Sequence, residues 1–347
     1  MSTLPLTPVR FAIAGLNHGH VNWWFQRPTR NDMQLVGVAE PSRSLAGRFE
    51  TQHGLAPSLL HTHLEAMLDS IRPQAVMAFG STFDHLAVVQ ACAPRGVHVM
   101  VEKPLAVSSA HAEQIAALAQ KHAIHVLTNY ETTWYASNHE AYRLVHDEHV
   151  IGDLRKIVVH DGHWGPKEIG CPPEFLAWLT DPVLNGGGAI MDFGCYGANL
   201  MTWLMDGAAP VSVMAVTQHI KPQTYPNVDD DATIVLNYPQ AQGIIQASWN
   251  WPWHRKDMEL YGATGAVHAV DKTILRIRDG LNQAERAQTL PPRATPFDDV
   301  FAYFAVVVRG DVSPVADDLS GLKNNVTVVR ILDAARESAR RQCVIHF

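Results

Sequence analysis

The chain has 347 residues, of which 47% are hydrophobic and 18% charged, and its formal net charge is −7. This is the composition of an ordinary globular protein with room for about two domains. The negative charge argues against a nucleic-acid surface or attraction to anionic membranes, and no apolar run approaches the roughly 20 residues of a membrane helix.

In the first 130 residues, short apolar runs alternate with helical patterns. Strands are predicted at 9–16, 34–40, 75–80, 98–104 and 124–130. A helical stretch follows the first strand, and apolar residues at helical spacing predict helices at 85–96 and 111–123. This alternation predicts βαβ units and a doubly wound parallel sheet, so residues 1–128 are expected to form a Rossmann-type α/β domain.

After about residue 130 the apolar runs become longer and more strictly alternating. They occupy residues 156–165, 211–220, 231–239, 243–251 and 257–270, and a helix is predicted at 324–341. Several strands in succession predict a second domain, residues 129–347, built on a large, mostly antiparallel sheet. The cleft between the two domains is the expected site.

Two features bear on location. The first residues have no charged segment ahead of a long apolar run, so no signal peptide is predicted. The cysteines are scattered, with no C-x-x-C pair, at Cys92, Cys171, Cys195 and Cys343. A reducing cytoplasm is therefore expected.

Histidine is frequent, and two H-x-H pairs could share one strand face and bind a metal. They are His18 with His20, and His61 with His63. Neither pair has a carboxylate or cysteine at ligand spacing, so these histidines are interpreted as packed or solvated, and no metal is predicted.

The stretch AIAGLNHGH follows the first strand, where a Rossmann phosphate loop belongs. In the G-x-G-x-x-G pattern, Gly15 holds the first position, Asn17 the second and His20 the third. Asparagine tolerates unusual backbone angles next best after glycine, whereas His20 is bulky for close packing of helix and strand. The alternative is a simple strand–turn–helix.

Glu40 ends the second predicted strand. An acid there accepts hydrogen bonds from the adenosine ribose and repels a 2′-phosphate, so NAD is favoured over NADP. Arg43, which could accommodate a phosphate, leaves NADP open, and Glu40 could also be a simple surface acid.

Two further motifs carry chemistry. Residues 186–207, GGGAIMDFGCYGANLMTWLMDG, place Asp192, Tyr196 and Asn199 at i, i+4 and i+7, which predicts one polar stripe on a helix. In VEKPLA, Glu102 and Lys103 end a predicted parallel strand, where α/β sheets bind ligands. A lysine there can donate to a substrate oxygen.

These motifs, together with STFDH, IGDLRKI and LYGATGAV in the same order, resemble the glucose–fructose oxidoreductase/inositol dehydrogenase family (Gfo/Idh/MocA) over nearly the whole chain. The resemblance implies an N-terminal Rossmann domain and a C-terminal domain with an open sheet. It also implies a homo-oligomer, a dimer or tetramer, formed through that sheet. The implied reaction is NAD(P)-dependent oxidation or reduction of a hydroxyl or carbonyl of a sugar, cyclitol or related compound.

The resemblance also implies site residues. Lys103, Asp192 and Tyr196 are the expected catalytic residues. Cofactor contacts are expected from Gly15, Asn17, His18, His20, Glu40, Ser81, His85, Glu102, Lys103 and Asn129. Substrate contacts are expected from Lys103, His163, Trp164, Asp192, Tyr196 and Asn199.

Two of these positions depart from the family. Members often carry histidine at the position of Tyr196 and aspartate at that of Asn199. A phenol can serve as acid/base, with a nearby Lys103 cation favouring its ionised form. The substitution at Tyr196 therefore changes the proton carrier and keeps the chemistry.

Trp249, Trp251 and Trp253 alternate along a predicted strand, and tryptophan faces can stack on sugar C–H groups. Burial of this row at an oligomer interface is the favoured interpretation. Two alternatives to a dehydrogenase remain: an NAD-dependent glycosidase of the same fold, with transient oxidation, and a non-catalytic ligand-binding regulator.

Overall fold

The computed structural model describes residues 7–26 and 30–347, so the start of the chain, where no signal peptide is expected, lies largely outside it. The first sheet has six parallel strands in the order β3-β2-β1-β4-β5-β6. They are β1 (Val9–Ala14), β2 (Met33–Ala39), β3 (Leu60–His61), β4 (Ala75–Ala78), β5 (His98–Glu102) and β6 (Val126–Asn129). The order reverses between β1 and β4, and the predicted Rossmann sheet is confirmed.

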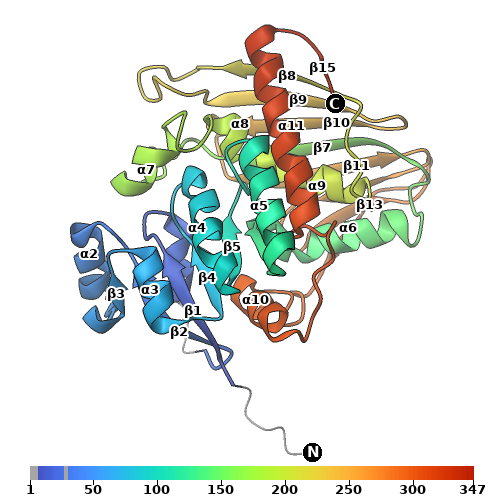
Figure 1. Ribbon diagram of the computed structural model, residues 1–347. Helices are drawn as coiled ribbons and strands as arrows, with labels where there is room; N and C mark the ends of the chain where they lie inside the picture. Colours follow the sequence, from blue (N-terminus) through green and yellow to red (C-terminus); the bar gives the residue numbers. More distant parts are fainter. Residues whose placement is uncertain (1–6, 27–29) are drawn as a thin grey trace, which may run out of the picture.

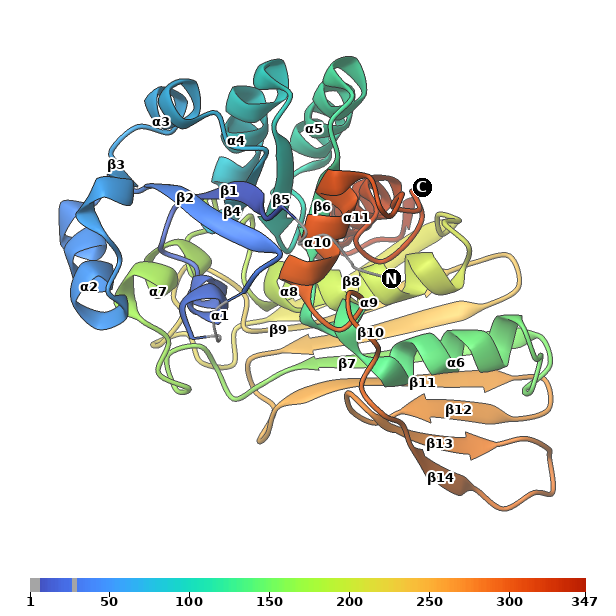
Figure 2. The same cartoon turned by 90° about the horizontal axis from the view of Figure 1, so that it is seen from below.

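Helices cover both faces of this sheet (Figures 1 and 2). One face carries α3 (Leu64–Ile71), α4 (His85–Cys92) and α5 (Ser109–His122); the other carries α2 (Arg43–His53) and α10 (Val300–Arg309). Helix α10 comes from far along the chain and contributes Phe301 and Phe304 to the core of the first sheet. The helix after β1 is short, a 3₁₀ turn at Gly19–Val21 followed by α1 (Asn22–Phe25).

The second sheet has nine strands in the order β14-β13-β12-β11-β7-β10-β9-β8-β15. They are β7 (Leu154–Gly162), β8 (Ser212–Gln218), β9 (Asp231–Asn237), β10 (Gln242–Ser248), β11 (Arg255–Gly262), β12 (Ala266–Ala269), β13 (Ile274–Arg278), β14 (Arg286–Thr289) and β15 (Ile345–His346). Within this second sheet, as far as the structure describes it, only β7 and β10 pair in parallel, so the predicted, mostly antiparallel sheet is confirmed. The run at 257–270 is two strands, because the chain turns between Gly262 and Ala266.

Helices α6 (Ala136–His146), α9 (Gly194–Leu204) and α11 (Leu322–Arg341) lie on one face of the second sheet (Figure 2). Helix α11 also packs against α5, so its apolar side chains contribute to the hydrophobic cores of both domains. Val329 joins the core of the first sheet, and Ile331 and Leu332 join that of the second. Since each such buried side chain contributes roughly 1.5–3 kcal/mol, α11 fixes how the two sheets face one another.

Two expectations concern the surroundings of the protein. Among the described residues, no helix combines the length and the apolar character that crossing a bilayer would require. The four cysteines are free thiols.

Candidate active site

The phosphate loop begins at Gly15, directly after β1, with φ of +81°. A Cβ at this position would lie 2.9 Å from the backbone nitrogen of Gly80, so the turn requires glycine. The loop therefore passes close to the end of β4, at the point where the strand order reverses. Asn17 follows, and its buried Oδ1 has no hydrogen-bond partner in the described structure.

A cavity of about 720 Å³ opens at this edge of the first sheet, and Gly15, Asn17, Glu40 and Gly80 are among its lining residues. The Glu40 carboxylate accepts hydrogen bonds from the backbone N–H of Leu16 at 2.9 Å and of Ser42 at 2.8 Å. Burial raises the pKa of Glu40, and these two bonds oppose the rise. An acid at the end of β2, a close glycine turn and an unpaired buried acceptor fit the adenosine half of a dinucleotide.

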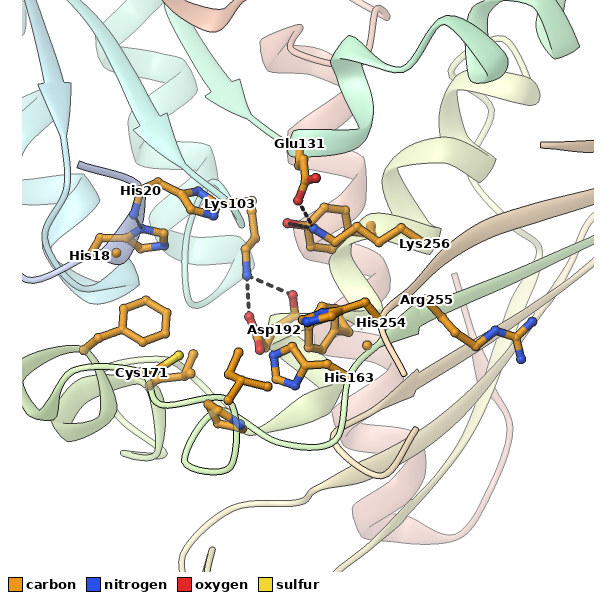
Figure 3. Close-up of a pocket in the computed structure, with 18 of the residues that line it drawn as sticks. His18, His20, Lys103, Glu131, His163, Cys171, Asp192, His254, Arg255 and Lys256 are labelled. Carbon is orange, nitrogen blue, oxygen red and sulfur yellow. Dashed lines mark hydrogen bonds and ion pairs between the residues drawn. The ribbon is translucent and has the colours of Figure 1, made fainter. Parts of the chain in front are cut away.

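A second cavity, of about 540 Å³, lies between the domains (Figure 3). Its lining includes His18 and His20 of the phosphate loop, Lys103 after β5, His163 after β7, and Asp192 and Tyr196 of the second domain. The structure thus brings together six residues expected for the cofactor or the substrate. Lys103 precedes Pro104 through a cis peptide bond.

Lys103 and Asp192 form a buried ion pair across the interdomain cavity. The Lys103 ammonium also donates to the backbone oxygen of Asp192 at 3.0 Å. Burial alone would lower the pKa of Lys103, but the Asp192 charge outweighs it and the pKa is raised. Burial would likewise raise the pKa of Asp192, yet Lys103 lowers it. Both groups are therefore held in their charged forms at neutral pH.

Tyr196 is buried beside this pair, and its hydroxyl faces a second lysine. Lys256 of β11 lies 3.4 Å from the Tyr196 hydroxyl and pairs with Glu131. The Lys103 ammonium instead lies over the Tyr196 ring, 5.3 Å from its centroid. Burial raises the pKa of Tyr196 well above its usual value. The expectation that Lys103 favours an ionised Tyr196 is therefore wrong, because desolvation dominates.

Glu102 is buried behind the phosphate loop. It accepts hydrogen bonds from Asn129 Nδ2 at 2.8 Å and from His20 Nδ1 at 3.0 Å. Burial would raise the pKa of Glu102, but the neighbouring His20 and His18 and these hydrogen bonds lower it to about 2. His18 and His20 therefore have a carboxylate neighbour that sequence spacing did not reveal, because Glu102 is distant in sequence but adjacent in space.

His163 lines the cavity, and its Nδ1 accepts a hydrogen bond from the backbone N–H of Gly165 at 3.0 Å. Burial lowers the pKa of His163 to about 4, although Asp192 opposes the shift. The imidazole is therefore neutral at physiological pH. Trp164, its neighbour, is 38% exposed and packs edge-on against His254, which lines the cavity.

Asn199 is turned away from the cavity, contrary to the expected polar stripe. Asp192 is the last residue of α8 (Ala189–Asp192), and the helix is interrupted at Phe193. Tyr196 and Asn199 lie on the next helix, α9. The Asn199 amide donates to the backbone oxygen of Leu319 at 2.8 Å, ahead of α11. Asp192 and Tyr196 therefore share the cavity, whereas Asn199 is held by the segment ahead of α11, and the polar stripe does not extend to it.

Four expected cofactor residues, Glu102 among them, bond within the protein and line neither cavity. The Ser81 hydroxyl donates a hydrogen bond to the Asp84 carboxylate at 2.6 Å, and His85 Nδ1 lies 3.2 Å from the backbone oxygen of Leu105. The Asn129 side-chain amide donates a hydrogen bond to the Glu102 carboxylate. They support the loops around the site rather than lining it.

The tryptophan row does not lie on a strand, because β10 ends at Ser248. Trp249 is fully buried and donates its indole N–H to Asp192 at 2.9 Å. Trp251 is half-buried, and Trp253 is 59% exposed. The three side chains therefore do not form one face, and Trp249 belongs to the active site.

Sequence reasoning missed Glu131, Tyr135, His254, Arg255, Lys256 and Lys272, which also line the interdomain cavity. The only sequence signal was the run HRK at 254–256, directly after the tryptophans. Lys272 pairs with Glu131 at 3.0 Å, so Glu131 lies between two lysines.

Two family models match the chain. The model described as an oxidoreductase family with an NAD-binding Rossmann fold matches residues 9–130. The model described as the GFO/IDH/MocA C-terminal domain matches residues 139–268.

Curated relatives are dehydrogenases. The chain is 27% identical over 222 residues to trans-1,2-dihydrobenzene-1,2-diol dehydrogenase of Sus scrofa, an alignment that covers 63% of this chain and 60% of that enzyme. It is 24% identical to D-xylose 1-dehydrogenase (NADP+) of Haloarcula marismortui, with 94% and 91% covered. It is 22% identical to scyllo-inositol 2-dehydrogenase (NADP+) of Bacillus subtilis, with 95% and 96% covered.

Solved structures share the fold. An inositol dehydrogenase homolog from Azotobacter vinelandii, solved with NAD+, superposes with a TM-score of 0.84 at 20% identity, covering 98% of each chain. Aldose-aldose oxidoreductase from Caulobacter crescentus gives a TM-score of 0.80 at 21% identity, covering 98% of this chain and 100% of the other. At these identities the likeness establishes the fold alone.

Proposed function

Because the chain belongs to the GFO/IDH/MocA family of NAD-binding oxidoreductases, we propose that it is a nicotinamide-dependent dehydrogenase or reductase. Its substrate would be a sugar, a cyclitol or a related compound with a reacting hydroxyl or carbonyl carbon. The observation that carries the proposal is the Lys103–Asp192 ion pair beside the Tyr196 ring, at the carboxyl edge of the parallel sheet. The named activities of the relatives support the substrate class.

The chain's own residues would bind and orient the reactants. Gly15, Asn17 and Glu40 would hold the dinucleotide, whose nicotinamide supplies or accepts hydride when bound. The Lys103 ammonium, fixed by Asp192, would donate to the substrate oxygen and stabilise negative charge there. The Tyr196 hydroxyl keeps its proton because burial raises its pKa, so it would act as a hydrogen-bond donor to the reacting oxygen.

The lysines around the interdomain cavity are paired with carboxylates, which suits a neutral polyhydroxylated substrate. Lys103 pairs with Asp192, and Lys256 and Lys272 both pair with Glu131. We propose NAD as the preferred cofactor, because the Glu40 carboxylate at the end of β2 would repel a 2′-phosphate. The NADP+ in the names of two relatives makes this a preference to be measured.

We also propose that the chain forms a homo-oligomer through the second sheet, on the face opposite its helices. Met214 and Val216 of β8 lie on that face and are 47% and 54% exposed. Light scattering after size exclusion tests this: a monomer at micromolar concentration would contradict it.

The function is tested by incubating the protein with NAD or NADP and a panel of aldoses, cyclitols and 1,5-anhydro sugars. Substrate-dependent absorbance of the reduced cofactor is expected for at least one class. Product analysis separates the reactions, because a dehydrogenase accumulates reduced cofactor and an oxidised sugar. No cofactor binding and no turnover across the panel would contradict the proposal.

A further inference from the structure

Oxidation of a hydroxyl releases a proton, and most groups around the interdomain cavity are poor acceptors for it. Tyr196 already carries its proton, since burial raises its pKa. Lys103 is fully charged beside Asp192. His163 accepts the Gly165 N–H at Nδ1, so the hydrogen of its neutral ring is on Nε2. None of these three groups presents a free lone pair to a substrate hydroxyl.

His18 cannot accept the proton either, because its one nitrogen without a hydrogen already accepts a hydrogen bond. Its Nδ1 accepts the backbone N–H of His20 at 3.1 Å, so the neutral ring carries hydrogen on Nε2. That nitrogen lies 3.9 Å from Glu102 Oε2. Burial lowers the pKa of His18 well below its usual value, so the ring stays neutral.

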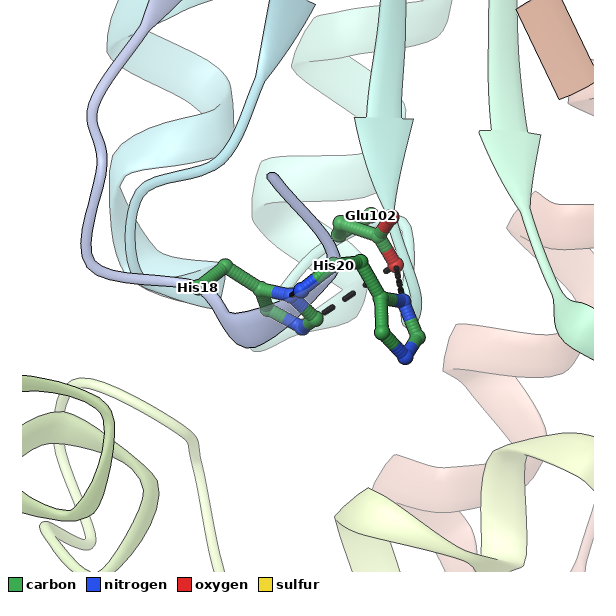
Figure 4. Close-up of side chains that lie close together, drawn as sticks. All are labelled: His18, His20 and Glu102. Carbon is green, nitrogen blue, oxygen red and sulfur yellow. Dashed lines mark hydrogen bonds and ion pairs between the residues drawn. The ribbon is translucent and has the colours of Figure 1, made fainter. Parts of the chain in front are cut away.

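His20 has the opposite tautomer. Its Nδ1 lies 3.0 Å from Glu102 Oε2, and an ionised carboxylate can only accept, so the ring donates from Nδ1 (Figure 4). In the neutral form of the ring, the free lone pair is then on Nε2. Asn129 fixes the other oxygen of Glu102, and Trp23 stacks on the His20 ring with centroids 3.8 Å apart.

His20 also connects two cavities. It lines the interdomain cavity together with Lys103 and Asp192. It lines a neighbouring cavity of about 600 Å³ as well, with Trp23, Trp134 and Lys272. A ring with a free nitrogen at this junction can take a proton on one side and release it on the other.

The same three side chains lie close enough to suggest a metal site, because ligand atoms of His18, His20 and Glu102 lie within 4.8 Å of one another. The hydrogen bonds argue against it. A metal on His18 Nε2 would displace the proton that its Nδ1 bond requires, leaving an imidazolate. The His20 nitrogen nearest Glu102 carries a proton too. The hydrogen bonds of the cluster therefore place hydrogens on the nitrogens that a metal would have to bind.

We propose that His20 is the general base of the oxidation, oriented by Glu102, an inference that rests on the proposed function. The substrate O–H proton moves to His20 Nε2 directly or through one water, while the carbinol C–H pair leaves as hydride to the bound nicotinamide. The alcohol becomes a carbonyl, and the imidazolium is balanced by Glu102. Reduction runs the same transfers backwards. The charged groups around His20 include Glu102 of β5, Lys103 and Asp192 at the interdomain cavity, and Glu131, Lys272 and Asp298 at the second cavity.

Two variants test the assignment. His20→Gln removes the base, and Glu102→Gln replaces the carboxylate by an amide that can still accept from Asn129. The new amide donates to His20 Nδ1, which moves the ring hydrogen to Nε2. Each variant should lower kcat by about 10²–10⁴-fold, with the double variant no worse than the singles, because the two residues act as a unit. NADH affinity, measured by fluorescence titration, should not change.

A second readout needs no substrate. Diethyl pyrocarbonate attacks the free lone pair of a neutral imidazole, so mass spectrometry should find His20 modified quickly in the native protein. Modification should slow in Glu102→Gln and stay fast in His122→Gln, a matched replacement at the end of α5. Equal His20 modification rates in native protein and Glu102→Gln would overturn the proposal.

Other results would overturn it in identifiable ways. A loss of NADH affinity in His20→Gln that matches the loss of turnover would make His20 a cofactor ligand. Calorimetric zinc binding that disappears in His20→Gln would make the cluster a metal site. Wild-type protein that binds NADH but oxidises no compound of the panel would refute the proposed function and this role with it, even if the modification rates match.

Discussion

Trp249 donates its indole N–H to one oxygen of Asp192 at 2.9 Å, while the other oxygen holds the Lys103 ammonium. Three segments thus meet at one carboxylate: the end of β5, the end of α8 and the residue after β10. The tryptophan fixes the direction in which the Asp192 carboxylate faces Lys103, so it acts as a positioning residue.

We expect Trp249→Phe to keep the bulk of the ring and remove this bond. A hydrogen bond to a charged group is worth about 1.5–3 kcal/mol, so urea unfolding should show a loss of that size. Turnover should fall with it, because Lys103 loses orientation. Trp251→Phe is the matched control, since its indole nitrogen has no partner in the described structure. Equal effects of the two substitutions would contradict the positioning role.

Tyr196→Phe should lower turnover in the direction of carbonyl reduction by about 10²–10³-fold, because it removes a hydrogen-bond donor to the reacting oxygen. Cofactor affinity should be unaffected, since the hydroxyl contacts Lys256 in the second domain. Steady-state kinetics and NADH titration measure the two quantities. Tyr130→Phe serves as the control, because that ring packs edge-on against Tyr196 at 5.4 Å without lining the cavity. Near-normal reduction by Tyr196→Phe would remove Tyr196 from the mechanism.

Glu40→Ala should weaken NAD binding and narrow the difference between NAD and NADP. The substitution removes the expected ribose acceptor and also frees the backbone N–H of Leu16 and of Ser42. Calorimetry with both cofactors at one salt concentration measures the ratio. If the wild-type protein binds NADP more tightly, the preference is wrong and Arg43 becomes the residue to test.

Stability should fall as the pH is lowered from 6.5 to 5. Burial holds the pKa of His163 and of His139 at about 4, whereas an unfolded histidine titrates near 6.5. Below pH 6.5 the unfolded chain binds more protons than the folded protein does. Each histidine should therefore lower the free energy of unfolding by roughly 2 kcal/mol between pH 6.5 and pH 5. Urea unfolding at the two pH values measures the loss, and His163→Gln should reduce it. An unchanged pH dependence in that variant would contradict the buried neutral state.

Much of the first domain was predictable from the sequence because it is built from local signals. Each parallel strand is a short apolar run, and each ends where polar residues begin, so Gly15, Glu40 and Lys103 could be placed at one edge of a sheet. The phosphate turn was equally local, since the backbone at Gly15 has a φ of +81°, which favours glycine.

The tertiary structure decided what faces those strand ends. Lys256 reaches Tyr196 because β11 pairs with β7 in a register that sets Lys256 opposite Asp161. Glu102 meets His20 because β1 and β5 lie on either side of β4. Helical spacing predicted the wrong surroundings for Asn199, since the segment ahead of α11 packs there and Leu319 accepts its amide hydrogen bond. The sequence by itself determined the elements and their chemistry, whereas strand register and the packing of distant segments determined which side chains share the cavity, because both depend on contacts between residues far apart in the chain.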